Sequence, residues 1–238
     1  MTPSYRVSLI DEGASRRAPR LAGRLRAGTR WFSLGLAAAA LAGCAGLSQV
    51  PPAPQVLDVG VVELPRQPLP PRAPLVVLPV AAAPLLQSNS VIWRENGTLE
   101  PNAYASFQWA SPPAALFGQR LRDRLSVEGP VLGTNSTGNL PELQVSLERF
   151  EQVFDPQAAA AGRSSSVGDF AMRAVLTRNG DVIDQLRLAL RVPASSDDAT
   201  GGARALRGAV DAATENIAQW LSQQPDLQLA TQQPSSGR

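Results

Sequence analysis

Apolar and polar residues alternate along three segments of the chain, at 143–147, 170–176 and 186–192. Such alternation is typical of β-strands that bury one face and leave the other in water. Asn179-Gly180 lies between the last two segments, and this dipeptide favours the tight turn of an antiparallel hairpin. Asn96-Gly97 separates two earlier apolar runs in the same way and predicts a second hairpin or tight turn.

In a further segment, 111–125, apolar residues recur at steps of three and four, which indicates an amphipathic helix. Ser111 is placed to cap this helix, and the two prolines that follow are tolerated in a first turn. The charged residues of the segment are expected mostly on the other faces of the helix: Arg120, Arg122, Asp123 and Arg124.

The same spacing over 203–220 predicts a second helix, whose apolar stripe is interpreted as packing against a sheet. Asp197 and Asp198 precede this helix and are expected to stabilise its amino end. Short β-rich runs at 57–64 and 74–80 add further strands. Together these elements predict one α+β domain, a mainly antiparallel or mixed β-sheet backed by two amphipathic helices.

A basic segment and a short apolar run precede the predicted domain. The run from Trp31 to Ala42 covers 12 residues, whereas a membrane-spanning helix needs about 20 strongly apolar ones. Arginines before the run and small residues after it are typical of an export signal. The run ends in "LAGC", Leu41 to Cys44, which resembles the lipobox of bacterial lipoproteins. The resemblance implies cleavage before Cys44 and acyl chains on that cysteine, which would anchor the protein stably.

Two features of this leader have other interpretations. A lone cysteine is often a small apolar core residue, but Cys44 follows the leader at the spacing of a cleavage site. Arg16-Arg17 could belong to a twin-arginine signal, although Pro19 follows and the apolar run starts 14 residues after Arg17. We therefore favour a lipoprotein signal.

The chain is accordingly divided into four parts. We expect a signal peptide over 1–43, a proline-rich flexible tether over 44–55, one domain over 56–222 and a disordered tail over 223–238. Within the domain, the stretch 155–168 is expected to be a mobile loop.

Removal of the leader changes the charge of the protein. The whole chain has 22 arginines, no lysine and 20 acidic residues, a net charge of +2. Residues 1–43 carry seven arginines and two acids, so the remainder has 15 arginines against 18 acids and a net charge of −3. No basic patch with interleaved aromatic residues remains, and we expect no nucleic-acid partner.

Residues for catalysis are scarce. The sequence has no histidine, which excludes histidine-assisted nucleophiles and histidine metal sites, and no lysine to complete a phosphate-binding loop. The carboxylates of Glu142, Glu148, Glu151 and Asp169 are expected on polar, solvated faces. We therefore expect no enzyme activity, no cofactor and no metal.

Aromatic residues cluster in one part of a chain that is only 5% aromatic. Trp93, Tyr104, Phe107 and Trp109 lie within 17 residues of one another. They either fill the core or place one or two rings on a surface that binds a partner, where tryptophan and tyrosine are enriched. Trp93, Tyr104 and Trp109 are the candidates for such a surface.

The segment 89–125 resembles the family of ABC-type transport auxiliary lipoproteins. The resemblance rests on an apolar strand that ends in Trp-Arg, a later tyrosine, a Trp-Ala pair and a helix with spaced leucines: Ile92, Trp93, Arg94, Tyr104, Trp109, Ala110, Leu116, Leu121 and Leu125. It extends more loosely over most of 56–222. The proline-rich stretch 65–74 departs from the family, because it is longer than the family pattern has there.

The resemblance implies a non-catalytic adaptor of a lipid transport system in the cell envelope. Its implied partners are a mammalian-cell-entry (MCE) domain protein, an ABC permease complex and the membrane that holds the acylated Cys44, with phospholipid as a possible ligand. Ala45, rather than aspartate, follows the cysteine and favours the periplasmic face of the outer membrane. The alternatives are a structural or assembly lipoprotein without a transporter, and a lipid-binding carrier.

Overall fold

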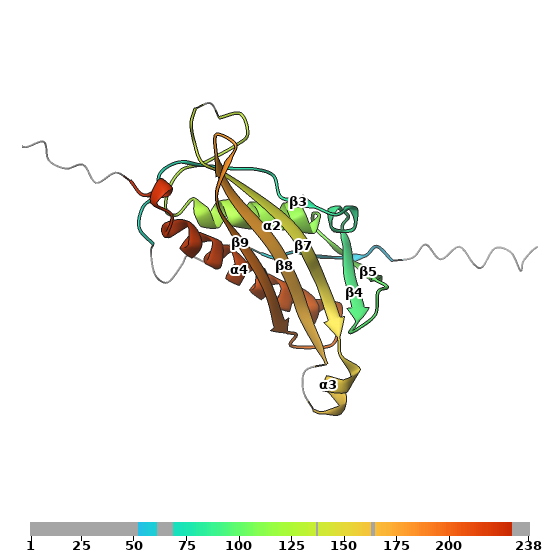
Figure 1. Cartoon of the computed structure of the whole chain (residues 1–238). Coiled ribbons are helices and arrows are strands. Elements are labelled where there is room, and N and C mark those ends of the chain that lie inside the picture. The colour runs from blue at the N-terminus through green and yellow to red at the C-terminus, as the bar shows by residue number, and fades with distance from the viewer. Residues whose placement is uncertain (1–51, 61–68, 137, 163–164, 230–238) are drawn as a thin grey trace, which may run out of the picture. The chain divides into compact units, whose positions relative to one another are not determined.

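The long strand β7 (Glu142–Phe154) lies at the centre of one mixed sheet (Figure 1). The computed structural model describes residues 52–60, 69–136, 138–162 and 165–229. One edge of β7 pairs along its length with the antiparallel strand β8 (Ser166–Arg178), which pairs in turn with β9 (Asp181–Pro193). In the turn of this hairpin Asn179 has φ 53° and Gly180 has φ 87°, left-handed values that asparagine and glycine tolerate best. The hairpin predicted around Asn179-Gly180 is confirmed.

Three short strands share the other edge of β7, and all of them run parallel to it. They are β2 (Leu75–Val77), β3 (Ala81–Ala82) and β4 (Ser90–Glu95). Beyond them the sheet continues with β5 (Asn102–Trp109), antiparallel to β4, then β1 (Gln55–Leu57) beside β5, and with β6 (Val131–Leu132) beside β2. The predicted turn at Asn96-Gly97 joins β4 to β5, so the second hairpin is also confirmed.

Two helices, α2 (Pro113–Leu125) and α4 (Ala199–Ser222), lie on the same face of the strands β7 to β9 (Figure 1). The side chain of Asp198 accepts a hydrogen bond of 2.7 Å from the backbone N–H of Gly201, which confirms its predicted role at the start of α4. Ser111 does not cap α2, because the helix begins after Pro112 and no side chain caps it. The α+β class with two amphipathic helices against a mixed sheet is as predicted.

Aromatic rings join the sheet to α2 in the core. Phe170 on β8 packs edge-on against Phe117 of α2, with ring centroids 5.1 Å apart, and lies 6.3 Å from Phe150 on β7. The apolar stripe of α4 completes the core, and its leucine, isoleucine and valine members are fully buried: Leu206, Val210, Ile217 and Leu221. Burial of this stripe explains its three-and-four spacing.

Two expectations are wrong in detail. The stretch predicted as a loop contains a short helix, α3 (Pro156–Ala160), because Asp155 accepts hydrogen bonds from the N–H groups of Gln157 and Ala158. Residues 223–229, predicted as the start of a tail, are instead part of the domain, since the one-turn helix η2 (Pro225–Leu227) packs against it and Leu227 is 1% exposed. A third short helix, η1 (Pro84–Gln87), precedes β4. The predicted signal peptide and Cys44 lie outside the described residues, as does 230–238.

Candidate partner-binding groove

The three aromatic residues proposed as a partner surface have different surroundings. Trp109 is 1% exposed and packs edge-on against Phe150, with ring centroids 5.3 Å apart. It belongs to the core, so its place in the candidate surface was wrong. Trp93 and Tyr104 are half-buried, and their ring centroids lie 6.2 Å apart. The structure therefore brings two of the three candidates together and separates the third.

Trp93 and Tyr104 line an open groove of about 610 Å³ at one end of the sheet. Phe154, at the end of β7, is the third ring of this groove, and it meets Trp93 edge-on with centroids 5.7 Å apart. The remaining lining residues come from β4, β5, α3 and the segment before α4: Glu95, Ala103, Ala105, Pro156, Ala159, Ser165 and Asp197. The walls are mainly apolar with a few polar groups, which is typical of sites that bind a ligand or a partner.

A bulge in β5 accounts for the position of Tyr104. The pairing of β4 with β5 shifts register between Ser90, which faces Gln108, and Ile92, which faces Ala103. Extra residues on one strand bend it and change where its side chains point. Inside this bulge Tyr104 contacts Phe107 edge-on, with ring centroids 6.0 Å apart. A regular hairpin pattern gives no sign of such a bulge, so alternation could not place Tyr104.

A chain of hydrogen bonds holds Tyr104 from below. Its hydroxyl donates to Oε1 of Gln152 at 2.9 Å, and Nε2 of Gln152 donates to the hydroxyl of Ser166 at 2.9 Å. That hydroxyl donates to Oδ1 of Asp197 at 3.0 Å. Gln152 and Ser166 are each 1% exposed, so the groove rests on a buried polar chain that is paired along its length.

Gln152 is a site residue that the sequence analysis missed, although a signal was present. Phe150, Gln152 and Phe154 are spaced by two on β7, so a polar residue occupies the inward-facing register between two aromatic ones. Gly202 of α4 gives this amide its room, because a Cβ there would lie 2.2 Å from Oε1 of Gln152. A larger residue at 202 would displace the Gln152 amide or move α4 away from β7.

The groove is electrostatically negative. Burial, with the charges of Asp198 and Asp197, raises the pKa of Tyr104 to about 12. Asp198 remains ionised, since the hydrogen bonds from the N–H of Gly201 and the hydroxyl of Ser196 hold its pKa below the usual value. Glu95 adds a third carboxylate at the rim. None of the described residues that line the groove is basic.

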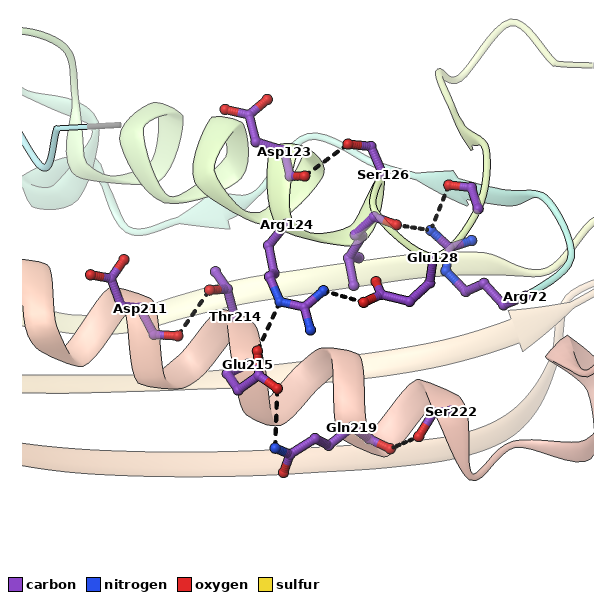
Figure 2. A network of polar contacts seen from close by, with 12 residues as sticks. Arg72, Asp123, Arg124, Ser126, Glu128, Asp211, Thr214, Glu215, Gln219 and Ser222 are labelled. Carbon is purple, nitrogen blue, oxygen red and sulfur yellow. Dashed lines mark hydrogen bonds and ion pairs between the residues drawn. The ribbon is translucent and has the colours of Figure 1, made fainter. Parts of the chain in front are cut away.

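A second polar cluster lies between α2 and α4, and the sequence analysis placed its arginines wrongly. Arg120 and Arg124 are each 3% exposed rather than solvated. Figure 2 shows Arg124 between Glu128 and Glu215, to which its Nη1 and Nε donate at 2.6 and 2.8 Å. Arg120 pairs in the same way with Asp211, one turn before Glu215 on α4. A matching pair of i, i+4 spacings, arginines on one helix and acids on the other, was the signal available.

The carboxylates Glu151 and Asp169 were also expected in solvent, and both are instead buried in ion pairs on the sheet. Glu151 is 5% exposed and bonds Arg94 at 2.7 Å. Asp169 is 8% exposed and accepts from Arg149 at 3.2 Å. These pairs are structural, because each acid is neutralised by an arginine on a neighbouring strand.

Across the described ranges, no group of three or more metal-binding side chains occurs.

Comparison with known proteins gives the family. A model of the family described as "ABC-type transport auxiliary lipoprotein component" matches residues 53–218, most of the described domain and its groove. The chain belongs to this family. No curated protein matches it.

Two solved structures show the same fold as this auxiliary lipoprotein. One is the crystal structure of protein XCC0632 from Xanthomonas campestris, of the DUF330 family: it is 20% identical, with a TM-score of 0.61, and the match covers 70% of this chain and 93% of that one. The other, described as an uncharacterized protein, is 17% identical with a TM-score of 0.55, covering 71% and 99%. Among the helices in the described ranges, none is both long enough and apolar enough to cross a bilayer.

Proposed function

We propose that this auxiliary lipoprotein is held at the periplasmic face of the outer membrane by acyl chains on Cys44 and serves an MCE-associated lipid transporter as a non-catalytic adaptor. The family match over residues 53–218 carries the proposal, together with the "LAGC" sequence that precedes the matched domain. The tether between Cys44 and β1 contains Pro51, Pro52 and Pro54, so the domain can reach away from the membrane.

The groove around Trp93 and Tyr104 is the surface proposed for docking the periplasmic end of the transporter. Both rings are half-buried, and the polar chain beneath Tyr104 holds that ring in place, so little side-chain entropy is lost when it contacts a partner. ATP hydrolysis would then belong to another subunit. The groove is open along its length, whereas a lipid carrier would need an enclosed apolar cavity, which favours the adaptor over the carrier.

The anchor is tested by fractionation of cells that produce the full chain or its Cys44→Ala variant. We expect the parent protein in the membrane fraction, with an intact mass that shows cleavage before Cys44 and added acyl chains. The variant should leave that fraction and keep the circular dichroism of the folded domain. Ser48→Ala, four residues further along, is the matched control. Unchanged fractionation of the Cys44 variant would contradict the anchor.

The docking surface is tested by co-purification from detergent-solubilised envelopes. Trp93→Ala with Tyr104→Ala should reduce recovery of an MCE-domain protein and of a permease with the lipoprotein. Val182→Ala is the control, because Val182 is 66% exposed and lies at the other end of the β8–β9 hairpin. Equal recovery with both variants would show that the groove is not part of the interface. If neither partner were recovered with the parent protein, the proposed association with a transporter would be contradicted.

A further inference from the structure

The groove combines aromatic rings with carboxylates that have no cationic partner among the described residues. The carboxylate of Asp197 accepts from Ser166 through Oδ1, and within the described part of the chain its Oδ2 makes no hydrogen bond. Glu95 forms no ion pair with any described residue, although Arg94 beside it is bound to Glu151. Both side chains are exposed and face the groove, whereas the buried acids of the sheet, Glu151 and Asp169, are paired with arginine.

The aromatic geometry suits a positive charge. Trp93 meets Phe154 at 89° and Tyr104 at 47°, so these rings are not stacked face to face, and all three line the groove. The face of a tryptophan or tyrosine ring attracts a cation, and the attraction is greater where the cation has lost water. The raised pKa of Tyr104 agrees with this, since the same negative potential that resists its ionisation would stabilise a cation.

We propose that the groove binds an arginine or lysine side chain of a partner protein, with the aliphatic stem against Trp93 and Phe154 and the charged head beside Asp197 and Glu95. Long cationic side chains bury their stems on apolar surface while the head keeps polar partners, which matches apolar walls with acidic ends. This inference rests on the proposed docking role of the groove and adds the chemistry of the partner.

The charges favour a protein side chain over a lipid headgroup. A phospholipid amine is joined to a phosphodiester, which would lie close to Asp197, Asp198 and Glu95 and be repelled by them. An arginine or lysine presents its charge on a neutral aliphatic stem. The open groove also admits a side chain that projects from a folded partner.

Fluorescence anisotropy of labelled peptides tests the inference with the full lipoprotein chain in detergent micelles. The peptides are identical except for a central arginine, lysine, glutamine or glutamate between leucines. We expect the arginine and lysine peptides to bind about tenfold more tightly than the glutamine peptide, and the glutamate peptide to bind most weakly. Asp197→Asn should remove most of this difference, and Trp93→Leu should weaken the binding of both cationic peptides.

Asp181→Asn is the matched control, because Asp181 is an exposed carboxylate at the far end of the β8–β9 hairpin and should leave all affinities unchanged. Near-ultraviolet circular dichroism checks that each variant is folded. Equal binding of the arginine and glutamine peptides, no binding of any peptide, or an unaltered preference in Asp197→Asn would overturn the inference. So would stronger competition by micelles containing phosphatidylethanolamine than by unlabelled arginine peptide, because that result assigns the groove to a lipid amine.

The two proposals fail separately in this design. If the peptides showed no preference for a cation while co-purification still depended on Trp93 and Tyr104, the adaptor role would stand. Only the proposed binding of a cationic side chain would be contradicted. If cationic peptides bound selectively but no transporter subunit were recovered, the groove would stand as a protein-binding site. The proposed association with a transporter would then be contradicted.

Discussion

The hydroxyl of Tyr104 lies between a buried amide and the charges of two carboxylates, so its ionisation reports on the groove. The only other tyrosine, Tyr5, lies in the predicted signal peptide, so the variant Tyr5→Phe removes its absorbance from any unprocessed chain. We expect the ultraviolet absorbance of tyrosinate in the folded variant to appear with a pKa of about 12. Adding Asp197→Asn should move that pKa down towards the ordinary value, since one repelling charge is removed.

The same shift fixes the sign of a change in stability. The pKa of Tyr104 is raised in the folded state, so its contribution is fully present below pH 10 and is lost as the pH rises towards about 12. Urea denaturation of Tyr5→Phe over this range should therefore show a free energy of unfolding that falls as the pH rises. The fall should be smaller in Tyr5→Phe/Tyr104→Phe. Titration of Tyr104 at its ordinary pKa in the folded protein would show that the groove is neither desolvated nor negative.

Single residues also mark where sequence patterns stop being informative. Trp93 and Trp109 belong to one aromatic cluster, yet one lines the groove and the other is 1% exposed, because a bulge separates their parts of the β4–β5 hairpin. Gln152 could have been noticed as a polar residue in an apolar register. Its partners Ser166 and Asp197 come from distant segments, and no local pattern connects them.

At the level of elements, prediction was good wherever a local signal was strong. The Asn-Gly turns and the three-and-four spacing gave both hairpins and both long helices. The short parallel strands β2 and β3 depend on contacts with β7, and their pairing could not be derived from their own residues. The faces of α2 were assigned wrongly because its arginines are neutralised by α4, a tertiary effect.

Arg124 joins α2 to α4, and its substitution should show how much this contact contributes to the free energy of unfolding. In Arg124→Met, Glu128 keeps a buried carboxylate without its partner, so we expect the free energy of unfolding to fall by about 3 to 5 kcal/mol. Arg124→Met/Glu128→Met should regain part of this loss, because neither member of the buried ion pair remains and Glu215 is 35% exposed, although the buried Arg72 loses the attraction of Glu128. Urea denaturation monitored by circular dichroism measures both.

The control for this pair is Arg122→Met, because Arg122 is a half-exposed arginine of the same helix that forms no ion pair with another described residue. It should change the free energy of unfolding by less than about 0.5 kcal/mol. A similar loss in Arg122→Met and Arg124→Met would mean that the cluster in Figure 2 does not stabilise the contact between the helices.

For the domain as a whole, β7 explains why distant segments must fold together. Its two edges pair with β2, β3, β4 and β8, so the first and last parts of the domain complete a single sheet and core. The family pattern could be recognised from sequence because these elements keep their order. The groove could not be recognised from the sequence, since it forms where β4, β5, β7, α3 and the start of α4 meet.

The segment before β2 meets η2 near the other end of the domain, which suggests a whole-molecule test. The N–H of Ala73 donates to the carbonyl of Leu227 at 2.8 Å, and the side chain of Leu227 is buried in the core. A chain that ends at Ser222 loses this side chain, so we expect its free energy of unfolding to fall by about 2 to 3 kcal/mol. A chain that ends at Leu229 keeps every one of these contacts and should match the full protein in urea denaturation. If both truncated chains were as stable as the full protein, the domain would end at α4, and the segment after it would be the tail that its composition predicts.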